Sequence, residues 1–142
     1  MASFKRKLQL ATIFVNFLAI VCAVVFESFA LTYAVQKPRS ELAIFGYIGV
    51  PLVIWAIACL VGFAWASKQE SADRFNGTSC QFLLGSFLLC QVVLISFMTV
   101  AFALSFIYYV LTASWLMLLV TGLGHVLTTL GLAVFSMFIS WL

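Results

Sequence analysis

The sequence predicts an all-α, polytopic membrane protein: a bundle of four transmembrane helices that forms one domain over residues 1–142. Of the 142 residues, 65% are hydrophobic and 8% are charged, whereas soluble domains carry about 25% charged residues. The apolar residues form long runs, and a helix needs about 20 of them to cross the hydrocarbon core. Each run must be helical, because an open sheet would leave backbone polar groups unsatisfied in lipid.

The first predicted helix covers residues 8–35. Its basic start, Lys5, Arg6 and Lys7, is typical of a signal peptide, but the apolar stretch of 28 residues that follows is far longer than a signal-peptide core. We therefore interpret it as a retained signal anchor whose cationic start lies on an anionic membrane face. The second predicted helix covers residues 42–67, after a short polar connection.

The last two helices share one long apolar segment. The 62 residues from position 81 to the end contain no Asp, Glu, Lys or Arg. This segment is too long for one helix and fits two helices with a tight turn between them. Residues 108–115 combine interfacial aromatic residues with small polar ones, which indicates the turn. The third helix is then expected at 81–107 and the fourth at 114–142, with the polar segment 68–80 before them.

The distribution of basic residues predicts the orientation. Five of them fall on one side of the membrane and two on the other: Lys5, Arg6, Lys7, Lys68 and Arg74 against Lys37 and Arg39. The positive-inside rule then places both termini in the cytoplasm. Asn76 begins an Asn-Gly-Thr glycosylation sequon, which faces the cytoplasm in this orientation and is expected to act as a turn sequence only.

Polar side chains within the apolar runs indicate where the interior of the bundle lies. Glu27 is the only acid inside the spans, and a charged residue at mid-bilayer costs about 2.5–3.5 kcal/mol on insertion scales. With a rise of about 1.5 Å per residue, counting from the helix ends places Glu27, Pro51, Thr99 and His125 in one layer of the outer half of the bilayer. We predict an intramembrane polar cluster of six residues: Glu27, His125, Thr99, Ser96, Thr121 and Asn16.

This predicted cluster has two interpretations. One is an ion or proton site, in which Glu27 supplies the charge and His125 acts as its partner or relay. The other is a structural clasp, in which hydrogen bonds fix one helix packing and Glu27 is either protonated or paired with His125.

Three further features concern packing and modification. Ala58, Gly62 and Ala66 recur every fourth residue, the small-residue pattern of a close helix contact in membranes. Pro51 cannot donate a backbone hydrogen bond and is expected to kink the second helix. Cys80 lies at a membrane boundary, where it is either an S-palmitoylation site or an ordinary interfacial thiol.

No motif in the sequence predicts catalysis. There is no nucleophile elbow, no HExxH and no phosphate-binding loop. The four cysteines have no metal-binding spacing, so we expect neither a metal nor another cofactor. The net charge of +3 comes largely from the N-terminal anchor, which argues against nucleic acid as a partner.

These observations favour a non-enzymatic tetraspan protein that acts as an accessory, scaffolding or assembly subunit of a larger membrane complex. Its partners would be the lipid bilayer and either other integral membrane proteins or further copies of itself. The alternative is a small oligomeric channel or transporter for ions or protons that uses Glu27. An ion or proton pathway should place Glu27 beside water or beside a symmetry-related copy of the chain. An accessory subunit should instead bury Glu27 against His125 or a partner chain.

Overall fold

The computed structural model describes residues 2–36, 41–68, 78–112 and 115–140, and all of them are helical. Each helix contains a segment that is long and apolar enough to cross a membrane. The predicted fold class is therefore confirmed, and the protein is a multi-pass membrane protein built as an all-α bundle. The four helices are α1 (Ala2–Gln36), α2 (Glu41–Lys68), α3 (Thr78–Thr112) and α4 (Trp115–Ser140).

Two helices are longer than expected from hydropathy. α1 begins at Ala2 rather than at residue 8, and α3 continues to Thr112 rather than ending at 107. Hydropathy detects the part of a helix that fits the hydrocarbon core, whereas backbone hydrogen bonding continues into the interface on either side. Most of the predicted turn at 108–115 is thus helical, and only residues 113–114 of it lie outside the described part of the chain.

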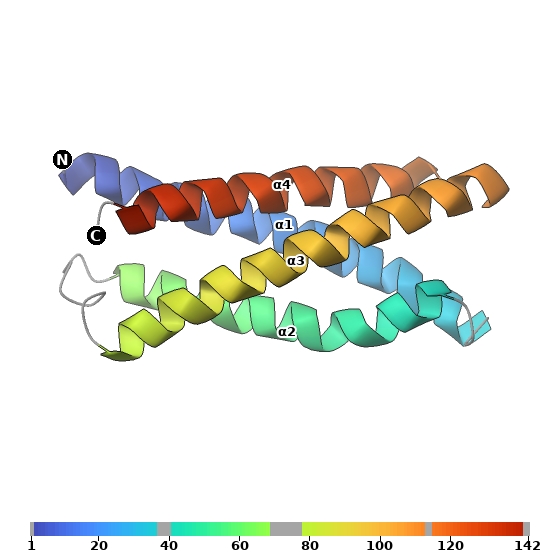
Figure 1. Ribbon diagram of the computed structural model, residues 1–142, viewed down its shortest axis with the longest axis horizontal. Helices are drawn as coiled ribbons and strands as arrows, with labels where there is room; N and C mark the ends of the chain where they lie inside the picture. The colour runs from blue at the N-terminus through green and yellow to red at the C-terminus, as the bar shows by residue number, and fades with distance from the viewer. Residues whose placement is uncertain (1, 37–40, 69–77, 113–114, 141–142) are drawn as a thin grey trace.

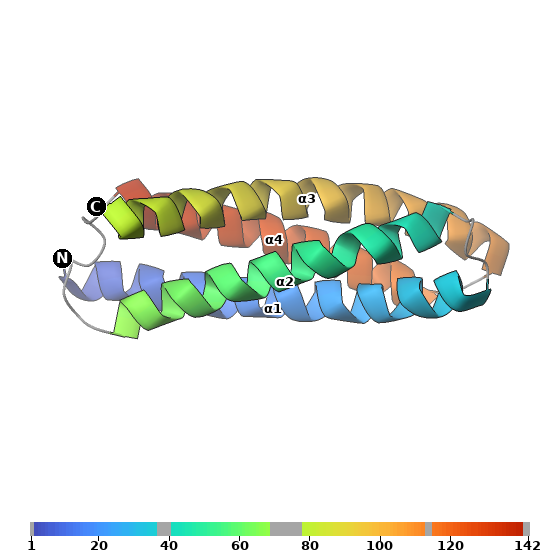
Figure 2. The same cartoon turned by 90° about the horizontal axis from the view of Figure 1, so that it is seen from below.

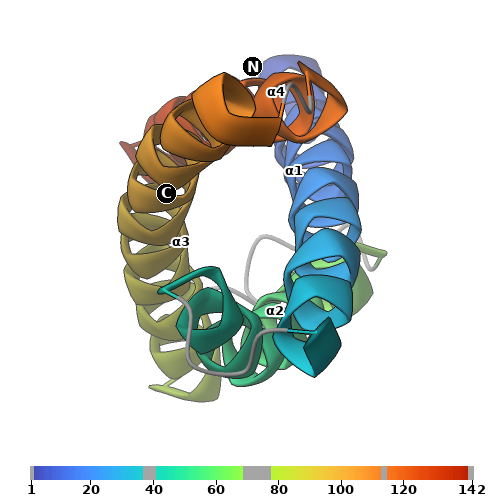
Figure 3. The ribbon, with the colours of Figure 1, turned by 90° about the vertical axis from the view of Figure 1, so that its right-hand side faces the viewer.

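The four helices run up, down, up and down around a ring. In Figures 1 and 2, the N-terminal end of α1 and the C-terminal end of α4 lie at one end of the molecule, beside the C-terminal end of α2 and the first turn of α3. Figure 3 shows the ring in the order α1, α2, α3, α4. Each helix packs on its two ring neighbours, and the interface between α1 and α4 is the most extensive.

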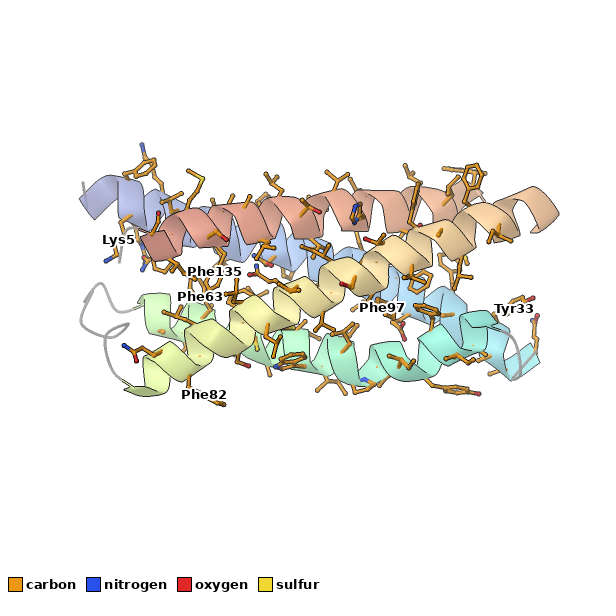
Figure 4. All side chains as sticks on the ribbon, in the orientation of Figure 1. Lys5, Tyr33, Phe63, Phe82, Phe97 and Phe135 are labelled. Carbon is orange, nitrogen blue, oxygen red and sulfur yellow. The ribbon has the colours of Figure 1, made fainter. Side chains whose placement is uncertain are left out.

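Aromatic side chains fill the interior at the end where the termini lie. The ring of Phe63 on α2 contacts Phe87 on α3 and both Phe135 and Phe138 on α4, with centroid distances of 5.3, 5.6 and 5.5 Å respectively. Figure 4 shows Phe63 and Phe135 pointing toward each other. Edge-to-face contacts of this kind add to the stabilisation from buried area.

A second aromatic cluster lies further along the bundle. Phe97 on α3 contacts Phe26 on α1 at 5.9 Å and Phe45 on α2 at 5.3 Å between ring centroids. In Figure 4, Phe97 lies on the opposite side of the bundle's middle from Phe63. The interior thus has an aromatic cluster toward each end, and the layer between them is where the polar side chains of α1 and α3 meet.

Glycines allow α1 to lie close to both of its neighbours. A Cβ atom added at Gly46 of α2 would lie 3.2 Å from the carbonyl carbon of Ala30, and one added at Gly124 of α4 would lie 3.1 Å from the Cβ of Cys22. In a bilayer, the hydrophobic effect does not drive helices together. Small residues at such positions favour helix association instead, because they let the backbones pack closely.

Candidate functional site

The inward face of α1 carries a row of polar side chains. Gln9, Thr12, Asn16 and Glu27 are all buried. Asn16 and Glu27 are 11 residues apart, which at about 100° per residue places them on nearly the same side of the helix. The predicted polar face of the first helix therefore points into the bundle, and it divides into an amide group near the middle and a carboxyl group nearer the far end.

Asn16 forms the centre of a buried amide pair. Gln91 of α3 donates a 2.8 Å hydrogen bond from Nε2 to Oδ1 of Asn16, and Nδ2 of Asn16 donates a 2.8 Å bond to the carbonyl of Thr12. On α4, Gly131 leaves room for the pair, because a Cβ there would lie 2.9 Å from Nδ2 of Asn16. The pair therefore links α1 to α3, which are not ring neighbours.

Gln91 was not among the predicted site residues. It is 1% exposed, and its Oε1 has no hydrogen-bond partner among the described residues. A detectable signal was present, because a single amide interrupts the apolar run of the third span. Such a residue is costly in lipid unless it finds an interhelical partner.

Glu27 is buried at the interface between α1 and α2. It is 5% exposed, and its carboxyl group lies against Gly49, where an added Cβ would overlap the carboxyl atoms. Within the described residues, neither Oε1 nor Oε2 has a hydrogen-bond partner. The site therefore accommodates the volume of a carboxyl group, while the described residues offer it neither a counter-charge nor a donor.

The structure does not bring His125 to Glu27. Nδ1 of His125 lies 3.2 Å from Oγ1 of Thr99 on α3. The neighbouring residue, Gly124, faces Cys22, which is five positions before Glu27 on α1, or about 7.5 Å along the helix. The expected Glu27–His125 pair is thus absent. The depth predicted from the helix ends is wrong, because Gly124 lies opposite Cys22 rather than opposite Glu27.

The outer side of α3 and α4 carries the rest of the predicted cluster. Ser96 and Thr99 are exposed, as is Thr129, and His125 is half-exposed. Each of the three hydroxyls donates to the carbonyl four residues earlier, at 3.1, 2.8 and 2.9 Å for Ser96, Thr99 and Thr129. We call these four residues the α3–α4 polar face: Ser96, Thr99, His125 and Thr129. It points toward the lipid rather than into the bundle.

Thr121 lies inside, apart from that face. It is fully buried and donates to the carbonyl of Met117 at 2.9 Å. Thr128 is equally buried and bonds within α4 to the carbonyl of Gly124. The buried positions of α4 recur every three or four residues, from Met117 through Gly124 to Phe138. This periodicity turns His125 away from the interior.

The predicted small-residue contact on α2 is only partly inward. Ala66 is buried, and a Cβ at Gly62 would lie 3.0 Å from Cδ1 of Leu83 on α3. Ala58, in contrast, is exposed. The inward position at that depth belongs to Cys59, whose Sγ lies 3.6 Å from Oγ of Ser86.

The remaining predicted features are Pro51, Cys80 and the sequon at Asn76. Pro51 is exposed within α2, which continues as one helix and is visibly bowed in Figure 1. Cys80 is in the first turn of α3, and its side chain lies outside the described part of the structure, as does Asn76. The described residues contain no group of three or more His, Cys, Asp or Glu side chains that could hold a metal ion.

Comparison with protein-family models, with curated proteins and with solved structures finds no match to this chain. The structure contains two polar regions that could serve a function: the interior row that ends at Glu27 and the outward α3–α4 polar face.

Proposed function

We propose that the protein is a non-enzymatic accessory subunit that assembles with another integral membrane protein through the α3–α4 polar face. One observation carries this proposal: four hydrogen-bonding residues gather on a surface that would otherwise face only lipid tails. Polar side chains in membrane helices normally face the interior of a bundle or a partner. A partner helix would form interhelical hydrogen bonds with the polar side chains of this face.

His125 gives the face a defined chemistry. The single hydroxyl hydrogen of Thr99 goes to the carbonyl of Ile95, at 2.8 Å. We therefore infer that Nδ1 of His125, which lies 3.2 Å from the same hydroxyl oxygen, carries a hydrogen and donates it. In the neutral imidazole, Nε2 is then a hydrogen-bond acceptor, and it makes no hydrogen bond to a described residue. This arrangement favours a partner helix that presents a donor, such as a hydroxyl, an amide or an indole N–H.

The alternative function, an ion or proton pathway built on Glu27, has less support. Between Asn16 and Glu27 the buried positions of α1 are apolar: Ala19, Ile20, Ala23 and Phe26. This interval spans about 16 Å. The buried hydroxyls of Thr121 and Thr128 on α4 donate to carbonyls of their own helix, so the apolar interval on α1 argues for a closed bundle.

The cytoplasmic orientation of the termini is part of the proposal. Lys5, Arg6 and Lys7 lie at the same end of the bundle as Lys68, the last residue of α2. Figure 4 shows Lys5 at this end and Tyr33 at the other. A concentration of basic residues at one end is typical of the cytoplasmic side. Lys37 and Arg39, which count for the other side, lie outside the described residues.

Site-specific photo-crosslinking in native membranes tests the lateral assembly. A benzophenone amino acid is placed either at Val126, beside His125 on α4, or at Val61 on the outer side of α2. The two positions are matched controls, because their side chains are 59% and 61% exposed. We expect protein adducts from position 126 and predominantly lipid adducts from position 61.

A double variant, Thr99→Val with His125→Leu, then tests the chemistry. Both replacements are compatible with lipid, so the bundle should still fold while the adduct at position 126 is lost. Equal adducts from both positions, or an adduct that survives the double variant, would contradict the proposal. If the only adduct formed is with a second copy of the chain, the result would favour the alternative function, an oligomeric channel or transporter.

A further inference from the structure

We propose that Glu27 is a proton-binding site, in which α1 and α2 pack around a neutral carboxylic acid and the proton holds their interface closed. This inference does not depend on the lateral assembly proposed above. It concerns the opposite side of the molecule from the α3–α4 interface, and it assigns a ligand, one proton, to the only acid within the spans.

Two glycines of α2 let the helices pack closely around the carboxyl group. On α2, Gly46 leaves room for the backbone of Ala30. Gly49, about one turn later, leaves room for the carboxyl group of Glu27. The carboxyl group is therefore one of the groups through which the two helices touch. Any side chain larger than hydrogen at Gly49 would occupy the space that the carboxyl group fills.

Among the described residues, no other group is placed to neutralise the carboxyl group. Within the described part of the chain, neither oxygen has a hydrogen-bond partner, and His125 is occupied with Thr99. The nearest titratable groups along α1, Cys22 and Tyr33, are more than a helical turn away on either side, and Tyr47 of α2 is exposed. An isolated carboxylate in such a place pays an uncompensated desolvation cost, whereas a neutral acid pays only for unmade hydrogen bonds.

A metal cation fits the site less well than a proton. Hard cations take six or more oxygen ligands, and Glu27 supplies only two carboxyl oxygens, neither of which has a hydrogen-bond partner among the described residues. No cluster of three acidic, histidine or cysteine side chains exists among the described residues. When α1 and α2 come together, Glu27 must therefore take up a proton, and formation of this interface is linked to proton binding.

Infrared spectroscopy of the full-length protein in lipid nanodiscs tests this directly, because the carbonyl stretch of a protonated carboxyl group is separate from the bands of a carboxylate. Carboxyl groups in water lose their proton near pH 4. At pH 7 the wild-type protein should therefore show a protonated-acid band from Glu27. Carbon-13 labelling of glutamate should shift that band, which assigns it to glutamate without any substitution.

Variants then locate the proton. The band should be absent in Glu27→Gln, should weaken in Gly49→Ala, where the carboxyl group is displaced from the interface, and should persist unchanged in Gly85→Ala, where a Cβ meets nothing within 4 Å. A wild-type spectrum at pH 7 without a protonated-acid band would refute the proposal. A band that disappears when choline is replaced by sodium or potassium at constant pH would also refute it, since a cation would then be the ligand.

Discussion

Gln91 donates a hydrogen bond to Asn16 across the middle of the bundle, between two helices that are not neighbours in the ring. On α3, Gln91 lies four residues after Phe87 and six before Phe97, so the amide pair occupies the layer between the two aromatic clusters. The pair is therefore a polar link through the core, and it joins the α1–α2 hairpin to the α3–α4 hairpin.

The amide pair should show a measurable coupling energy. Asn16→Leu and Gln91→Leu should each destabilise the bundle, because each leaves the other amide buried without its partner. The double variant should be less destabilised than the sum of the two, by about 0.6 kcal/mol and at most about 1.7 kcal/mol, the average and the maximum found in double-mutant cycles of interhelical hydrogen bonds in a membrane protein. Unfolding of the single and double variants in mixed detergent micelles gives this value. Additive effects would show that the bond contributes no pairwise stabilisation.

Gly49 should tolerate less substitution than Gly85. Gly49→Ala should destabilise by about 1–3 kcal/mol, the usual cost of overpacking, because the new methyl group overlaps the carboxyl group of Glu27. Gly85→Ala is the matched control and should be neutral or stabilising, since it adds helix propensity in open space. Thermal unfolding in detergent compares the two. Combining Gly49→Ala with Glu27→Ala should restore stability, and failure to do so would place the clash elsewhere.

Gly62 and Ala58 should respond differently to the same added bulk, although they are one turn apart. Gly62→Leu should lower stability by about 1–3 kcal/mol, because the added side chain meets Leu83. Ala58→Leu should change it little, since Ala58 is exposed on the outer side of α2. Melting temperatures of the purified variants provide the comparison. A larger loss at position 58 would indicate that this position contacts a partner in the detergent-solubilised protein.

Glu27 and His125 should behave independently. They share no hydrogen-bond partner, and His125 is engaged with Thr99. In a double-mutant cycle of Glu27→Gln and His125→Ala, the two effects should add within about 0.3–0.5 kcal/mol. A larger interaction energy would indicate that the two side chains meet, as counting along the sequence predicts.

The orientation can be tested with the sequon at Asn76. If both termini and the segment 69–77 face the cytoplasm, protein made in microsomes should carry no glycan, because glycosylation occurs in the lumen. Glycosidase treatment should then leave its gel mobility unchanged. A mobility shift that disappears in Asn76→Gln would place this segment in the lumen and reverse the topology.

The fold was predictable because its determinants are local in the sequence. Each run of about 20 or more apolar residues must be helical in a bilayer, and four such runs with short connections give an antiparallel ring. The inward direction of Glu27 and Asn16 was also predictable, since the polar stripe of a membrane helix is favourable only on the side that faces away from lipid. Helix ends were less predictable, because Thr112 and Ala2 lie beyond the hydrocarbon segment that hydropathy measures.

The partners of the polar residues were not predictable. Whether His125 points inward depends on the rotation of α4, which is set by the buried series that includes Thr121 and Gly124. The series is defined by burial against the other helices, so the sequence of α4 alone did not identify it. The same holds for Trp55, which donates a 3.1 Å hydrogen bond to Ser86 on the neighbouring helix. Rotation and tilt are properties of the bundle, and a single helix sequence constrains them weakly.

The position of the amide pair also fixes the vertical register of the bundle. If α1 slid along α3 by one turn, about 5.4 Å, Asn16 and Gln91 would separate and each would face apolar or aromatic neighbours. The aromatic clusters on either side would lose their own edge-to-face partners in the same movement. Piston-like sliding of the helices is therefore strongly opposed, whereas splaying of the α1–α2 hairpin from the α3–α4 hairpin at either end leaves the central pair intact. Any conformational signal that this protein passes to a partner should travel as a change of helix tilt about the Asn16–Gln91 layer.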